Sequence, residues 1–212
     1  MRRASVIVVS AALVGGLAAP AAAGTETEKY ESRSASAWWR TTQTIEPGVK
    51  LRTTWYVDAY DTNDYFGAWV YRSVARCTLV DDRRRCRTLE WSSGGTRRLR
   101  DGDVFTVDRQ ARAGELEVTV KLTTRNRDGI VSRKVPTRVS ATFEGTGDLS
   151  TGRDTSTWTS ECGRYHSTST YRSREAVASA TVGGTDLGDA RGGYLSWSTY
   201  RVTYDEDDSC YY

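Results

Sequence analysis

Five aromatic residues are the strongest candidates for binding chemistry in this sequence. They are Tyr56, Tyr60, Tyr65, Trp69 and Tyr71. Tyr and Trp rings combine flat apolar surface with a polar group, which suits them to stacking on sugars or anchoring a partner protein. We expect a carbohydrate or cell-wall polymer as the ligand, with a protein partner as the second choice. Burial of the rings in an ordinary core is the alternative.

A second candidate is a cluster of arginines at a predicted hairpin tip, formed by Arg83, Arg84, Arg85 and Arg87. Such a tip could bind an anionic polymer or present an arginine to a partner enzyme, as an inhibitor or toxin-like protein does. Like charges at a strand edge also prevent pairing with another molecule, which is the simpler explanation.

Signatures of catalysis and of cofactor binding are sparse. The only histidine, His166, has no nucleophile motif around it, so a catalytic triad is not expected. A hydrolase with paired carboxylates stays open, because sequence does not reveal how far apart two acids lie. Candidate acids are Glu90, Glu115, Glu144, Glu161 and Glu175. No cofactor is expected, although an acidic turn could supply oxygens to calcium. That turn contains Asp58, Asp61, Asn63 and Asp64.

Two hairpins must position the rings and the arginines. Asp, Asn and Thr favour turns, and they occur at 61–64 and again at 81–82. The first turn predicts that Tyr60 faces Tyr65, with the five rings on one side of the hairpin. The second predicts that Cys77 faces Cys86 at a position suited to a disulfide. Cys162 and Cys210 would then form the second disulfide.

The rest of the chain has the pattern of an all-β protein. Runs of Val, Thr, Tyr and Trp alternate with Gly and Asp turns, and the clearest strand is 116–124, preceded by a partner at 104–107. We expect an antiparallel β-sandwich or flattened barrel of about nine or ten strands, stapled by disulfides. It would occupy residues 38–212 as one domain, with a possible division near Pro136.

The first residues indicate export. Met1, Arg2 and Arg3 precede an apolar segment and a small-residue site at 21–23, which predicts a secretory signal peptide over 1–23 and an extracellular protein. Residues 24–37 are small and polar, and they predict a disordered spacer. After cleavage 28 basic and 27 acidic residues remain, so neither nucleic acid nor membrane is an expected partner. The preference for Arg over Lys is typical of GC-rich bacterial genomes.

Together these features predict a secreted, non-catalytic β-domain that binds carbohydrate or cell-wall polymer through its aromatic side. The alternatives are a hydrolase that uses paired carboxylates and an inhibitor or toxin-like protein that presents the arginine-rich loop.

Overall fold

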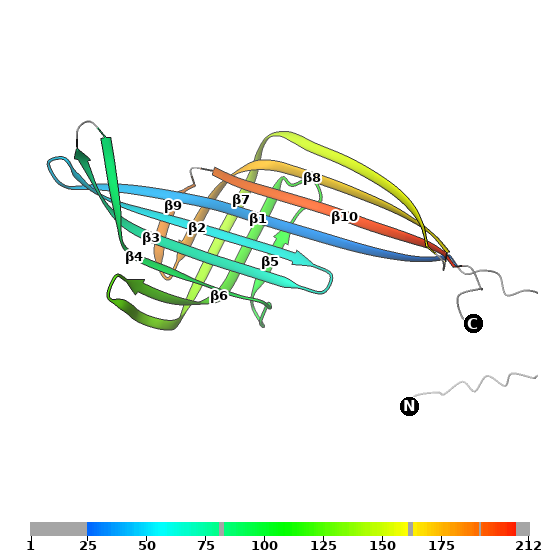
Figure 1. Cartoon of the computed structure of the whole chain (residues 1–212), viewed down its shortest axis with the longest axis horizontal. Helices are drawn as coiled ribbons and strands as arrows, with labels where there is room; N and C mark the ends of the chain where they lie inside the picture. Colours follow the sequence, from blue (N-terminus) through cyan, green and yellow to red (C-terminus); the bar gives the residue numbers. More distant parts are fainter. Residues whose placement is uncertain (1–24, 81–82, 161–162, 191, 207–212) are drawn as a thin grey trace, which may run out of the picture.

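The computed structural model describes residues 25–80, 83–160, 163–190 and 192–206, and it is all-β (Figure 1). Its strands are β1 (Thr25–Glu46), β2 (Val49–Thr62), β3 (Phe66–Val80), β4 (Arg83–Thr96), β5 (Val104–Val107), β6 (Ala113–Asn126), β7 (Gly129–Ser160), β8 (Gly163–Val182), β9 (Thr185–Asp189) and β10 (Gly192–Glu206). All pairings are antiparallel. The predicted all-β, disulfide-stapled fold of nine or ten strands is confirmed. No helix in the described part is long and apolar enough to cross a membrane.

The ten strands form one sheet that returns on itself. Its order is β10-β1-β2-β3-β4-β6-β7-β8-β9, with β5 on β6, and β10 also pairs with β8. The long strands β10, β1, β2 and β3 run along the near side, and β5, β6 and part of β7 cross behind them (Figure 1). The β4–β6 pairing is short, from Glu90 opposite Asn126 to Gly95 opposite Lys121. The sheet thus has a sandwich-like interior.

The core lies between these two layers and draws on nearly every strand. In β6 the predicted alternation is confirmed, since Leu116, Val118, Val120 and Leu122 are buried. Across the core, the Phe66 and Phe105 ring centres lie 5.7 Å apart, and Trp39 Nε1 donates a 2.9 Å hydrogen bond to the Gly188 carbonyl. Burial of this apolar surface is the main contribution to stability.

Residues 25–37 are a correction, because they form most of β1 and not a disordered spacer. β1 pairs with β10 on one side and with β2 on the other. Ala35 and Ala37 are buried, whereas Ser34 and Ser36, which alternate with them, face outward. The sequence did not indicate this strand because its residues are small, and its core side needs little side-chain volume.

The chain shows no break near Pro136. That residue lies within β7, opposite Lys121 of β6, and β7 continues to Ser160. Residues 38–136 and 137–206 therefore share one sheet. The predicted signal peptide over 1–23 lies outside the described residues.

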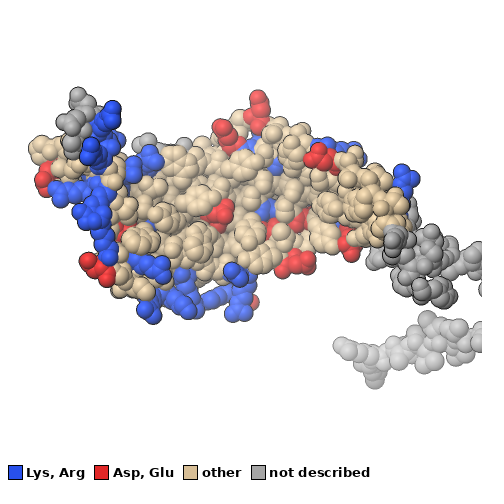
Figure 2. Space-filling view, viewed as in Figure 1, with Lys and Arg blue, Asp and Glu red and all other residues tan. Residues whose placement is uncertain are grey.

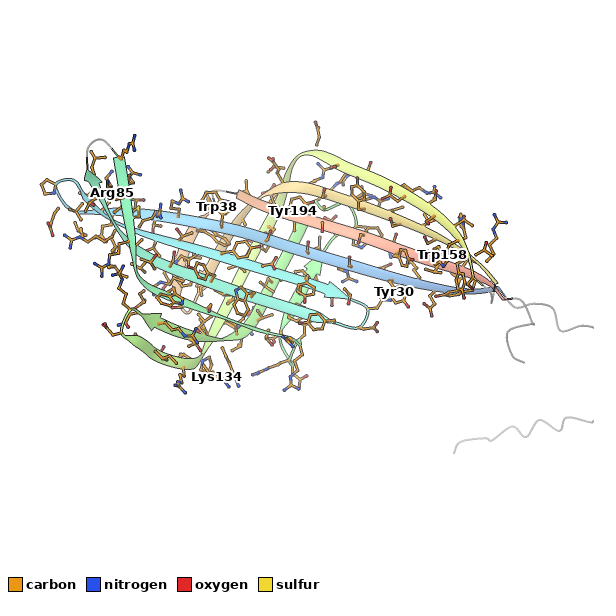
Figure 3. All side chains as sticks on the ribbon, in the orientation of Figure 1. Tyr30, Trp38, Arg85, Lys134, Trp158 and Tyr194 are labelled. Atoms are coloured by element: carbon orange, nitrogen blue, oxygen red, sulfur yellow. A yellow bond between two sulfur atoms is a disulfide. The ribbon has the colours of Figure 1, made fainter. Side chains whose placement is uncertain are left out.

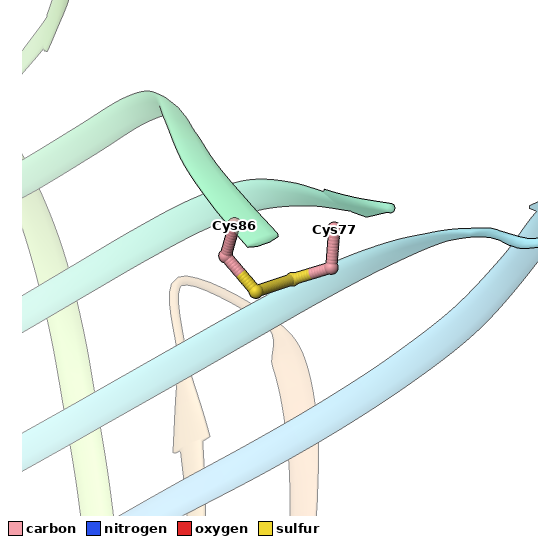
Figure 4. The surroundings of a disulfide bond; sticks show 2 residues. All are labelled: Cys77 and Cys86. Atoms are coloured by element: carbon pink, nitrogen blue, oxygen red, sulfur yellow. A yellow bond between two sulfur atoms is a disulfide. The ribbon is translucent and has the colours of Figure 1, made fainter. Parts of the chain in front are cut away.

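The second hairpin has the predicted register. Val80 pairs with Arg83, and Cys77 pairs with Cys86. The two cysteines form a disulfide that ties β3 to β4 (Figure 4). The turn at 81–82 and the proposed Cys162–Cys210 disulfide fall outside the described residues.

The first hairpin differs from its predicted register. Tyr60 pairs with Gly67, not Tyr65, because Thr62 and Tyr65 close the turn around Asn63 and Asp64. The Thr62 amide donates a 2.7 Å hydrogen bond to the Tyr65 carbonyl. The slip moves the partner by two residues, and a shift of two keeps every side chain on its own side of the sheet. The two predicted sides are therefore correct although the pairing is wrong.

Candidate functional site

The five predicted rings lie on the outer side of β2, β3 and the turn between them. Their exposed fractions are 37% for Tyr56, 42% for Tyr60, 37% for Tyr65, 49% for Trp69 and 37% for Tyr71. The core alternative is therefore wrong for these rings. Val57 and Val70, which alternate with them, fill the core instead.

Two further rings extend this group onto neighbouring strands. Trp38 of β1 pairs with Tyr56, which pairs in turn with Tyr71, so three rings form a row across three strands. Tyr194 of β10 is opposite Ser36 of β1 and is 46% exposed. We name this surface, on the outer side of β10, β1, β2 and β3, the aromatic face; its rings are Trp38, Tyr56, Tyr60, Tyr65, Trp69, Tyr71 and Tyr194.

Sequence reasoning missed Trp38 and Tyr194. The domain was predicted to begin at Trp38. The preceding part of β1, which determines to which side of the sheet Trp38 points, was not predicted. Tyr194 follows the end of the hairpin by more than 110 residues, and the β1–β10 pairing brings it near. The signal that could have found them is that Ser or an aromatic residue occupies every second position in 30–38 and in 194–200.

Glycines let several of these rings lie across the sheet. A Cβ at Gly67 would stand 2.7 Å from the Tyr60 ring, and one at Gly95 would stand 3.0 Å from the Trp69 ring. A Cβ at Gly192 would similarly stand 2.9 Å from the Trp38 indole nitrogen. Rings that cover a neighbouring glycine compensate for its missing side chain. Tyr60 and Trp69 thereby lie close to the sheet with their other side available to a ligand, whereas the Arg40 guanidinium lies 5.1 Å from the centre of the Trp38 ring.

Two hollows open on the aromatic face. One, of about 310 Å³, is lined by Asp58, Tyr60, Tyr65, Trp69 and Arg97 among others, and Tyr60 stacks on Tyr65 there with centres 5.2 Å apart. The other, of about 490 Å³, is lined by residues that include Ser36, Trp38, Tyr56, Glu175 and Tyr194. Asp58 of the first is paired with Ser36 of the second, so the hollows are neighbours. Each combines aromatic rings with a carboxylate.

Asp58 is the half-buried acid at the centre of the face. Burial raises the pKa of its carboxyl, and a hydrogen bond with the Tyr56 hydroxyl opposes that rise. Burial likewise raises the pKa of Tyr56, with the Asp58 charge as the next cause. The pair offers a ligand a hydroxyl and a carboxylate beside an exposed ring.

The predicted calcium residues do not converge. Asp58 lies on the outer side of β2 and Asp61 on the opposite side, facing Phe66 across the pair. Asn63 is occupied, because its amide donates to the Lys29 carbonyl at 2.8 Å and accepts from the Glu31 amide at 2.9 Å. In the described ranges no three His, Cys, Asp or Glu side chains form a group that could hold a metal ion.

The arginine tip is separate from the rings. Arg83, Arg84, Arg85 and Arg87 are exposed at the β3–β4 hairpin, which projects from one end of the molecule. Lys and Arg side chains gather there and along the lower rim in Figure 2, while the middle of the near side is mostly uncharged. Figure 3 shows Arg85 at that end and Trp38 and Tyr194 near the middle.

Three of the acids proposed for hydrolysis, Glu115, Glu144 and Glu175, lie on the outer side of β6, β7 and β8. Glu144 pairs with Ala113 and with Val177, so it is the diagonal neighbour of the other two. Glu90 forms a 2.6 Å ion pair with Arg72, Glu175 lines the larger hollow, and Glu161 is outside the described residues. His166 Nδ1 lies 2.8 Å from the Thr157 hydroxyl on exposed strands. None of these contacts has the arrangement of a nucleophile with its base.

The chain matches no protein-family model, no curated protein and no solved structure. Its function therefore has to be argued from the chemistry of the aromatic face.

Proposed function

We propose that this is a secreted, non-catalytic bacterial protein that binds a linear carbohydrate or cell-wall polymer through the aromatic face. The observation that supports it is the exposure of the predicted rings side by side on one surface, with Asp58, Glu175 and Ser36 between and beside them. Sugar rings present C–H groups to an aromatic ring and hydroxyls to polar side chains. This surface offers both kinds of partner.

The shape of the site supports a chain-like ligand. Two shallow neighbouring hollows favour an extended molecule over a compact one, which would fit a single enclosed pocket better. Secretion, which rests on the signal-peptide pattern, would place the site where such polymers occur.

The test is binding of the purified protein to a glycan array and to insoluble cell-wall polysaccharides. We expect Trp69→Ala and Tyr71→Ala each to weaken binding at least ~10-fold, a loss of about 1.4 kcal/mol. Ile130→Ala, which removes an exposed apolar side chain at the start of β7, is the matched control and should bind as the unaltered protein does. Unchanged binding by both ring variants would contradict the proposal.

The arginine tip supports a second candidate, an inhibitor of a trypsin-like enzyme. Arg84 and Arg85 are exposed on a hairpin that the Cys77–Cys86 disulfide closes, and a constrained strand with an exposed basic side chain fits such an enzyme's cleft. Inhibition of trypsin that is lost in Arg85→Ala, without any glycan binding, would favour this function over the first.

A further inference from the structure

Beyond the core, four strands continue as an arm. It consists of 25–33 of β1, 150–160 of β7, 163–172 of β8 and 197–206 of β10. β2 pairs with β1 only as far as Ser32, and β6 pairs with β7 only as far as Glu144. The connected core cluster contains no residue of the arm. Arg172 and Arg174 bind the carbonyls of Arg109 and Gln110, in a loop that closes the end of the core.

The outer side of the arm continues the aromatic face. Between the two lies a band of serines in which the Ser34 and Ser196 hydroxyls are 2.7 Å apart and those of Ser32 and Ser198 are 2.6 Å apart. A sugar chain can lie across such a row of hydroxyls, because hydrogen bonds to the protein replace those that the sugar loses to water.

A second group of rings stands at the far end of this band. Tyr30 and Tyr200 are paired, with ring centres 6.3 Å apart. Trp158 stacks on Tyr165 at 5.3 Å, and Tyr165 meets Tyr204 edge to face at 5.2 Å. Tyr30, Tyr200 and Trp158 are about 40% exposed, at 39%, 40% and 41%. In Figure 3 Tyr30 and Trp158 lie at one end of the molecule, well separated from Trp38 and Tyr194.

Glu28 lies at the centre of this second group. Its Oε2 accepts hydrogen bonds from the Tyr30 hydroxyl at 2.5 Å and the Tyr204 hydroxyl at 2.9 Å. Within the described part of the chain no hydrogen bond reaches Oε1. The two tyrosines therefore orient the carboxylate and leave one oxygen for a ligand donor, and an ammonium group is the strongest such donor beside aromatic rings.

We propose that the arm carries a second subsite, and that the polymer which spans both is a glycan whose sugars bear free amino groups. This rests on the proposed function and adds the class of sugar. Each ring group contains a carboxylate: Asp58 and Glu175 on the aromatic face, and Glu28 on the arm. Basic side chains of the arm, such as Lys29 and Arg172, lie on its opposite side. Two cations, Arg97 in the smaller hollow and Arg40 beside Trp38, also lie on the aromatic face. An amine-bearing chain therefore complements the carboxylates of the arm and of the larger hollow, and a phosphate-rich or uronic acid chain does not.

The spacing of the two subsites predicts a dependence on ligand length. Tyr194 and Tyr200 are six residues apart on β10, which corresponds to about 20 Å along a strand. A chain long enough to reach both ring groups binds the second as an intramolecular event, which raises its affinity without any new kind of contact.

The experiment compares two β-linked glucosamine oligomers by calorimetry, one short enough for a single ring group and one longer than about 20 Å. We expect the long oligomer to bind the unaltered protein at least ~10-fold more tightly than the short one. Glu28→Gln keeps the side-chain shape and should abolish most of that preference. Glu46→Gln, which neutralises an exposed carboxylate at the end of β1 remote from the arm, is the matched control and should preserve it.

The outcomes separate the inference from the proposed function. Retention of the full length preference in Glu28→Gln would overturn the second subsite. Equal binding of a fully N-acetylated long oligomer would overturn the role of the amines. In both cases loss of short-oligomer binding in Trp69→Ala would still support the proposed function, whereas absence of any glycan binding by the unaltered protein would overturn both. Near-ultraviolet circular dichroism checks that the variants are folded.

Discussion

At the scale of single residues, the Tyr–Glu contacts on the arm have a measurable electrostatic consequence. The hydrogen bond to the Glu28 carboxylate raises the pKa of Tyr204 to about 12, because ionising the phenol would place two negative charges together. The same tyrosines lower the pKa of Glu28. What these contacts add to stability is therefore present above the ordinary pKa of Glu, 4.5, and below that of Tyr, 10.0. It is lost as pH falls below that range, or rises from 10.0 towards about 12.

We expect Glu28→Gln to return the pKa of Tyr204 from about 12 towards its ordinary value of 10.0. The measurement is the ultraviolet absorbance of phenolate during an alkaline titration. The Tyr204 contribution is isolated by subtracting the titration of Tyr204→Phe in each background. A Tyr204 that titrates at the same pH with and without the carboxylate would show that the contact does not form in solution.

At the scale of strands, β1 is the element on which the closure of the sheet depends. It is the shared neighbour of β2 and β10, and it supplies Ala35, Ala37 and Trp39 to the core. The side chains on its outer surface belong to the aromatic face and to the arm. Interior and binding surface therefore depend on the same strand.

Paired substitutions on the two sides of β1 test this placement. We expect Ala37→Asp to reduce the free energy of unfolding by roughly 3–5 kcal/mol, because it buries an unpaired charge. Ser34→Asp is the matched control: it adds the same group on the outward side, opposite Tyr60 and Ser196, and should cost less than about 1 kcal/mol. Urea denaturation measures both. Equal and small effects would mean that residues 25–37 do not form a strand of the folded protein.

How much of the fold the sequence could predict depended on how each strand is covered. β6 was found because one side is core and the other is water, which produces strict alternation of Leu and Val with polar residues. The Cys77–Cys86 register was found because Asp81 and Asp82 are typical turn residues, and a two-residue turn there pairs the two cysteines. β1 was missed because neither part of it shows alternation of large apolar and polar residues. Its core side is formed by alanine, and its segment in the arm is exposed to water on both sides.

The candidate site was predictable only in part, for a related reason. Successive side chains of a strand point to opposite sides, so the spacing of the rings in the sequence determines which side each occupies. The five rings were therefore placed together correctly. The contributions of Trp38, Tyr194 and Glu175 depend on pairing between strands far apart in the chain. Local residue patterns do not specify those pairings.

At the scale of the whole molecule, body and arm differ in what holds them together. The body has a core enclosed by two layers, whereas the arm relies on backbone hydrogen bonds, serine pairs and stacked rings. Local opening needs less free energy where few apolar contacts are lost. Stability should therefore decrease from the body towards the end of the arm.

Hydrogen exchange followed by mass spectrometry measures this gradient. We expect the amides of 115–117 and 121–122 in β6, which are paired on both sides, to exchange slowest. Those of 150–160 in β7 should exchange at least ~10-fold faster, since β7 there has a paired strand on one side only. The amides of 139–144, in the same strand but paired on both sides, are the internal control and should behave like β6. Uniform protection along β7 would show that the arm is as stable as the body.

The side chain of Asn63 has a consequence for how copies of this protein could assemble. Its amide occupies the position beside Lys29 and Glu31 that the peptide group of an added strand would need. A sheet that accepts new strands at both margins can grow into a fibre, whereas one that accepts them at a single margin stops at a pair. By obstructing the β1 margin, Asn63 opposes the addition of a strand on that side of the arm.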